Sequence, residues 1–285
     1  MTKREQIKHI TPFTEVHLGS EAYLNRRFDK FITALKTKPA MPFNALIRLS
    51  ESLFRHHLIL SRSEELIHTS AKVMYTLKEA ELRRSVQADS FFIEILGEQI
   101  EISGNLKPDG QLPSKLCDLL HIAYLFDLNH EVLFDKLLPS KPAIRNNPFH
   151  VKRQTFFQNV YQGASISTLK TSHAELTRSA IRGETLYHGL DVEKYIVSKE
   201  AAGVYQAKYL PVTELYLKLF TDDSKKLTDR IINYSRSRIA YLHHADLISS
   251  LTDAIDYDLL ALLKLADKNN VDVRVTSDYA PYHLI

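Results

Sequence analysis

Apolar residues recur with helical spacing along most of this chain, and that periodicity constrains the fold more than any other feature. Apolar side chains three or four residues apart predict amphipathic helices. We expect helices at about 20–38, from 42, at 61–87, 114–126, 129–138, 149–162, 165–182, 199–209, 212–220, 224–243 and 246–267. Because the 285 residues include only 8 glycines, a loop-rich β fold is not expected. The predicted fold class is mainly α, a multi-helix array or bundle.

One stretch breaks the helical pattern. The sequence SFFIEILGEQIEIS alternates apolar and polar residues and predicts a β-hairpin at about 91–103. A loop made of Gly97 and Glu98 fits a type II′ turn, and its register places Glu94 opposite Glu101 on the outer face. A lone hairpin is only marginally stable, so we expect this one to lie on helices.

The order of the segments suggests how the chain is organised. The segment 114–126 is apolar nearly all round, which predicts a helix at the centre of the fold. The segment 139–148, PSKPAIRNNP, interrupts the helical pattern and is a candidate boundary within a single domain, between lobes at 1–138 and 149–285. Near the end, VDVRV at 271–275 alternates with period two and predicts a short strand.

Composition excludes several classes of protein. The formal net charge is only +3, which does not demand a nucleic-acid partner. Cys117 is the single cysteine, so neither an internal disulfide nor a zinc site with several thiolates can form. The N-terminal stretch has no apolar run typical of a signal peptide, and no run of about 18 apolar residues predicts a membrane span. We therefore expect a cytoplasmic protein with no membrane partner.

Three groups of residues offer candidate chemistry. Cys117 and His121 lie one helical turn apart and could act as nucleophile and base in a hydrolase. The doublets His56–His57 and His243–His244 could supply metal ligands, although adjacent helical residues point about 100° apart. In both cases we favour a structural role, and we predict no cofactor, no metal and no enzymatic activity.

A basic helix is the third group. Its cations could track a nucleic-acid backbone and are Lys225, Lys226, Arg230, Arg236 and Arg238. Three aspartates, Asp222, Asp223 and Asp229, are interspersed among them. We therefore favour a solvated helix face, and a helical nucleic-acid-binding protein remains the alternative.

The order of segments resembles a known family. Helices precede FFIEILGEQIEI, an apolar helix and FDLNHEVLFDKLL follow it, and the chain ends with YDLLALLKLADKNNVDVRVTSDYAP. This pattern resembles the bacterial immunity-protein family numbered forty-nine, which is found beside polymorphic toxins. The resemblance implies a mostly helical protein that binds a cognate toxin domain and covers its active site. It implies no chemistry of its own.

Two acidic groups are the predicted toxin contacts. The first is the hairpin group, with members Glu94, Glu98 and Glu101. The second is the group at the start of the last helix, with members Asp253, Asp256, Tyr257 and Asp258, to which Tyr279 adds a tyrosine beside an acid. Acids on an exposed strand could also prevent aggregation, and acids at a helix start could complement the helix dipole. A structural role for both groups therefore remains the alternative to toxin contact.

Overall fold

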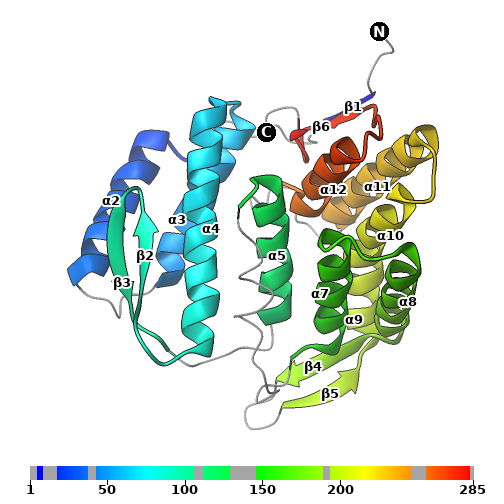
Figure 1. The fold of residues 1–285 in the computed structure, drawn as a ribbon, viewed down its shortest axis with the longest axis horizontal. Coiled ribbons are helices and arrows are strands. Elements are labelled where there is room, and N and C mark those ends of the chain that lie inside the picture. Colours follow the sequence, from blue (N-terminus) through cyan, green and yellow to red (C-terminus); the bar gives the residue numbers. More distant parts are fainter. Residues whose placement is uncertain are drawn as a thin grey trace.

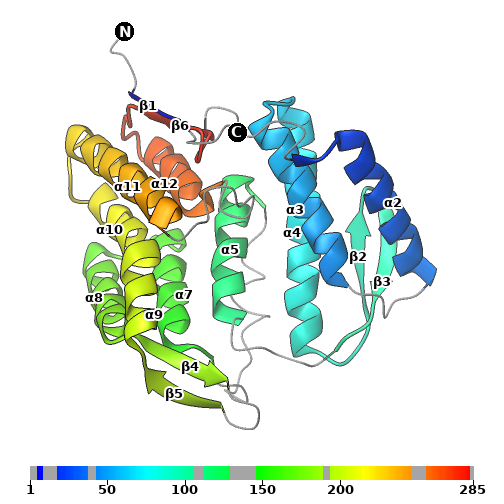
Figure 2. The ribbon, with the colours of Figure 1, turned by 180° about the vertical axis from the view of Figure 1, so that it is seen from behind.

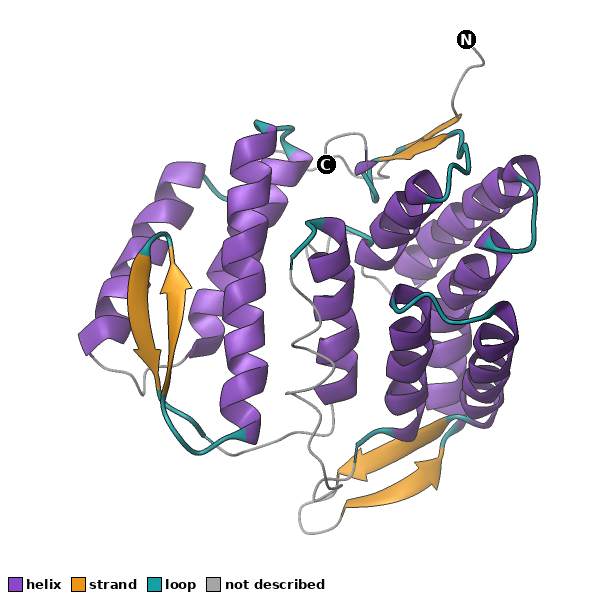
Figure 3. Ribbon diagram, viewed as in Figure 1, coloured by secondary structure: helices purple, strands orange, loops and turns teal. Residues whose placement is uncertain are grey.

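A computed structural model describes residues 5–8, 18–37, 43–105, 112–128, 146–188, 193–244 and 255–282. Over these residues the chain is mainly α-helical, with three short pairs of strands (Figures 1 and 3). The predicted fold class is therefore confirmed. The helix predicted at 129–138 lies outside the described residues.

Three helices and the predicted hairpin form the part of the fold at the left of Figure 1. The elements are α2 (Glu21–Thr37), α3 (Phe43–Ile59), α4 (Glu64–Val86), β2 (Phe91–Ile95) and β3 (Glu98–Ile102). Alternate hairpin residues join apolar side chains of all three helices in one buried cluster. The prediction that helices support the hairpin is thus confirmed.

The predicted turn of the hairpin is wrong by one residue, and the predicted pairing register is consequently wrong by two. The loop residues are Leu96 and Gly97, with φ angles of 52° and 82°. Positive φ at both central positions is the mark of a type I′ turn, whose twist matches that of the strands. Glu98 consequently belongs to strand β3, and Glu94 lies opposite Gln99. No two glutamates face each other across the strands.

The helix α5 (Leu112–Leu125) lies between the two sides of the molecule (Figures 1 and 2). It packs against α4, α7 (Pro148–Tyr161) and α12 (Tyr257–Lys268), as its apolar surface predicts. The larger buried cluster includes residues from Ile7 to Ala280. Most of the candidate lobe boundary lies outside the described residues, so the two-lobe division stays a prediction.

A second hairpin follows α8 (Ile166–Arg182), between the helices predicted at 165–182 and 199–209. Its strands are β4 (Glu184–His188) and β5 (Glu193–Val197), at the lower edge of Figure 1. Gly183 ends α8 with φ of 64°, and an added Cβ there would lie 1.9 Å from a backbone oxygen. Several side chains of this hairpin are exposed, so a clear alternation is missing.

The two helices predicted at 199–209 and 212–220 form one continuous helical run. It consists of α9 (Lys199–Val204), a π-helical segment η1 (Tyr205–Tyr209) and α10 (Leu210–Leu219). Pro211 has no N–H to donate to the preceding turn, which favours the wider π geometry there. The run then leads to α11 (Ser224–His244).

The two ends of the chain pair with each other. Strand β1 (Glu5–Ile7) runs parallel to β6 (Val275–Ser277), next to α11 and α12 (Figure 1). A short C-terminal strand therefore exists, but it begins at the last residue of the predicted stretch 271–275. Among the described residues, no helix combines the length and apolar character needed to cross a membrane.

Candidate functional site

The outer face of the first hairpin carries an exposed aromatic side chain beside acids. Phe91, Ile93 and Ile95 point into the core, so strand alternation turns Phe92 and Glu94 outward. Phe92 lies opposite Glu101, and its exposed fraction is 63%. Leu96 at the tip is 64% exposed. This hairpin face, defined as Phe92, Glu94, Leu96, Gln99 and Glu101, combines exposed apolar side chains with negative charge.

Glu98 does not belong to the hairpin face. It pairs with Ile95, whose side chain points into the core, and so lies on the opposite face of the strands. There it forms an ion pair with Lys36 near the end of α2. The structure thus separates Glu98 from Glu94 and Glu101.

The acids at the start of α12 are engaged inside the protein. Asp256 caps the helix by accepting the N–H of Leu259, and it accepts a 2.7 Å hydrogen bond from the hydroxyl of Tyr234. Arg238 lies 3.2 Å from the same carboxylate. Asp256 is buried, so it presents no open carboxylate to a partner in this conformation.

Asp258 has a similar environment. It lies 2.7 Å from Arg153 and 3.1 Å from Nε2 of His121. Burial alone would raise the pKa of the Asp258 carboxyl, but Arg153 and His121 outweigh that effect and hold this pKa well below its ordinary value. Tyr216 donates a hydrogen bond to the backbone carbonyl of Asp258. The carboxylate therefore compensates a buried arginine.

The remaining predicted contacts also lie inward or outside the described residues. Tyr257 is half-buried and stacks on Phe54, with ring centroids 6.0 Å apart. Tyr279 is buried. Asp253 lies outside the described residues. In this conformation only Glu94 and Glu101, among the described predicted residues, keep their carboxylates on the hairpin face.

Asp256, Tyr257 and Asp258 line a charged pocket of about 190 Å³. Its cationic side chains come from five elements and are Arg55, Lys78, Arg153, Lys208 and Arg238. Its carboxylates are Glu51, Asp118, Asp256 and Asp258. Most of these charges compensate one another, as in the 2.5 Å ion pair of Glu51 with Lys78. The pocket is thus an ion-pair network between the two sides of the molecule.

Cys117 and His121 do not form a catalytic pair in this structure. Cys117 is fully buried, and burial raises the pKa of its thiol to about 12, which favours the unreactive protonated form. Nδ1 of His121 lies 2.5 Å from the Tyr161 hydroxyl, while Nε2 faces Asp258. The imidazole is therefore directed at other partners.

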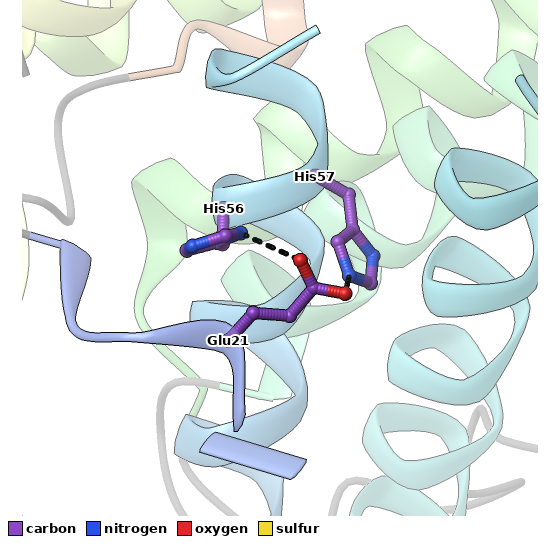
Figure 4. A group of neighbouring side chains, drawn as sticks. All are labelled: Glu21, His56 and His57. Carbon is purple, nitrogen blue, oxygen red and sulfur yellow. Dashed lines mark ion pairs between the residues drawn. The ribbon is translucent and has the colours of Figure 1, made fainter. Parts of the chain in front are cut away.

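The first histidine doublet, His56–His57, lies beside an acid from another helix. Glu21 at the start of α2 reaches between His56 and His57 of α3 (Figure 4). The distances are 3.9 Å from His56 Nδ1 and 3.5 Å from His57 Nε2 to the two carboxylate oxygens. Glu21 belongs to α2 and the histidines to α3, so the spacing of residues in the sequence does not predict this cluster. It forms through the packing of the two helices.

The basic helix is largely compensated by acids. Arg230 pairs with Asp222, Lys226 with Asp223, and Arg236 with Glu5 of strand β1. A phosphate-binding face needs cations that are available to the ligand. These pairings favour the solvated helix face over the nucleic-acid alternative.

Comparison with protein-family models, with curated proteins and with solved structures gave no match.

Proposed function

We propose that this chain is an immunity protein that binds a cognate bacterial toxin domain and covers its active site, without enzymatic activity of its own. The observation that carries the proposal is the hairpin face, where Phe92 is 63% exposed beside Glu94 and Glu101. The order of sequence segments that resembles the immunity-protein family gives independent support.

The hairpin face has properties suited to binding a protein. Binding energy at interfaces concentrates in a few large side chains that a partner can enclose, and polar groups around them exclude water. Phe92 and Leu96 supply such side chains. The inward isoleucines fix the hairpin to the core, so little conformational freedom is lost on binding.

The charge on this face indicates the kind of partner. Glu94 and Glu101 have no ion-pair partner among the described residues. They would attract a basic surface and speed its association. We therefore expect the toxin domain to present cationic residues around an apolar pocket that accepts Phe92.

The proposal predicts that a toxin gene lies beside the gene for this chain, and co-expression with the domain it encodes tests the proposal. The wild-type chain should abolish killing. Phe92→Ala should weaken binding by about 2 kcal/mol, the range of a hot-spot residue. Glu94→Lys with Glu101→Lys should mainly slow association and reduce its dependence on salt. Both can be measured by surface plasmon resonance.

A matched control reverses two exposed acids outside the hairpin, Glu175→Lys and Asp229→Lys. It makes the same change in net charge and should leave binding intact. Unabated killing in the presence of wild-type chain would remove the proposal. Equal binding by the Phe92 variant, the hairpin double variant and the control would show that another surface contacts the toxin.

A further inference from the structure

Glu21, His56 and His57 form a compact group of metal-ligating side chains (Figure 4). One potential donor atom from each lies within 4.8 Å of the others. The group joins two helices that are separate in sequence, because Glu21 begins α2 and the histidines lie near the end of α3. We call it the Glu–His–His cluster.

Adjacent histidines can both reach one point here because they offer different nitrogens. His56 approaches the carboxylate with Nδ1, the nitrogen nearer its backbone, whereas His57 approaches with the more distant Nε2. Their rings are nearly perpendicular, at 86°, with centroids 6.0 Å apart. The different reach of the two nitrogens compensates for the 100° divergence of neighbouring helical residues.

The environment of His57 favours an additional ligand. Both of its ring nitrogens are buried, and neither forms a hydrogen bond with any described residue. A buried polar group without a hydrogen bond is unfavourable, so such groups normally have a partner or an ordered water. A metal ion between Nε2 of His57 and the Glu21 carboxylate would supply a partner for that nitrogen.

The spacing is close to what zinc requires. Zinc–ligand bonds of about 2.0–2.2 Å in a tetrahedron place neighbouring donor atoms roughly 3.4 Å apart. The two contacts with the carboxylate, 3.5 and 3.9 Å, are near this value but go to different oxygens of Glu21. With one donor atom from each residue the atoms lie within 4.8 Å of one another, so binding one ion requires them to close by up to about 1.4 Å. A neighbouring pocket of about 160 Å³, lined in part by Glu21 and His57, leaves space for a water molecule as fourth ligand.

We propose that the Glu–His–His cluster binds one divalent transition-metal ion, with zinc preferred, and that the ion fastens α2 to α3. Two imidazoles and one carboxylate suit zinc better than magnesium or calcium, which take oxygen ligands. Arg62 now lies 3.3 Å from Glu21, but its side chain is 40% exposed and can turn into solvent when a cation replaces it. The proposed toxin binding does not depend on this site.

Zinc binding to the chain without a histidine tag tests the proposal. After dialysis against EDTA, isothermal titration with ZnCl₂ should give one ion per chain, and zinc should raise the melting temperature. Cobalt(II) should give the intense visible absorption of a four-coordinate ion. His57→Gln and Glu21→Gln should each weaken zinc binding by more than about 10-fold, since even outer partners of metal ligands contribute that much.

Two controls separate this site from others. His243→Gln with His244→Gln changes the exposed doublet at the end of α11 and should leave zinc binding unchanged. Arg62→Gln should bind zinc at least as tightly as the wild type. Absence of saturable zinc binding and of the cobalt spectrum in the wild-type chain would overturn the proposal, whether or not the variants fold. So would undiminished binding by both folded ligand variants.

Discussion

His150 offers the sharpest test of the buried interior. It follows Asn147 in the first turn of α7, and its ring packs edge-on against Tyr205 and Tyr209. Burial, assisted by the nearby charges of Arg153 and Lys208, lowers the pKa of its imidazole from 6.5 to about 3. The folded protein therefore holds this ring neutral at a pH where the unfolded chain protonates it.

The sign and size of the effect follow from proton linkage. Between pH 6.5 and 3 the unfolded state binds one more proton, so stability falls as the pH falls. With about 1.36 kcal/mol per pKa unit, lowering the pH from 7 to 5 should cost about 2 kcal/mol. This figure changes little for any folded-state pKa below about 4, because His150 then stays neutral at pH 5.

Urea denaturation followed by far-UV circular dichroism can measure this contribution. We expect His150→Phe, which keeps an aromatic ring in the site, to lose about 2 kcal/mol less stability than the wild type between pH 7 and 5. His243→Phe, at an exposed position, should behave as the wild type. If His150→Phe loses as much as the wild type over this range, the imidazole is not held neutral and the reasoning fails.

Three further predictions concern positions whose surroundings are equally well defined. Asp258→Asn should reduce the free energy of unfolding by about 3–5 kcal/mol, because the buried Arg153 loses its ion-pair partner. In the same denaturation assay, Glu94→Gln at an exposed position should change it by less than about 0.5 kcal/mol. Leu96→Asn should stabilise the protein by about 0.5–1 kcal/mol, because asparagine tolerates the positive φ of the type I′ turn better than leucine; a loss of stability would contradict this account of the turn. Cys117 should react with a thiol reagent only as the chain unfolds, since its thiol is buried and its pKa is raised to about 12; rapid labelling of the native protein would show that the thiol is accessible.

Local patterns predicted most of the described helices and the existence of the first hairpin. The helix expected at 246–267 is wrong at its start, because Ile255 and Asp256 are not helical and α12 begins at Tyr257 with Asp256 as its cap. Helices α8 and α11 start and end within one residue of their predicted limits, because amphipathic spacing and end signals agree there. The predicted register of the first hairpin was wrong because Leu96 adopts a left-handed backbone conformation, which is normally found for glycine or asparagine. The sequence did not predict the second hairpin because Tyr187, Tyr195 and Val197 are apolar yet exposed. The strands therefore lack the alternation of apolar and polar residues that indicates a half-buried strand.

The candidate sites were harder to predict, since they depend on contacts distant in sequence. Asp258 accepts a hydrogen bond from Arg153, which is 105 positions away in the sequence. The local sequence pattern around either residue does not predict this contact. The same holds for Glu21 and the histidines of α3. Phe92 is different, because its outward position follows from the inward Phe91 and Ile93 on either side of it. Its exposure could have been inferred from alternation alone.

The internal pairing of acids decides which charges a partner can contact. Asp256 pairs with the partly buried Arg238, Asp258 with the buried Arg153, and Glu98 with Lys36. The formal net charge of +3 therefore says little about the hairpin face, where the carboxylates of Glu94 and Glu101 stay available. A typical stable interface covers about 800 Å² on each partner, which is more than this narrow face provides. A toxin that encloses Phe92 must also extend beyond the hairpin, and Leu66 of α4, exposed beside the tip residue Leu96 in the pocket next to the Glu–His–His cluster, continues the apolar surface. An ion that fastens α2 to α3 would then stabilise the two helices that pack against the hairpin.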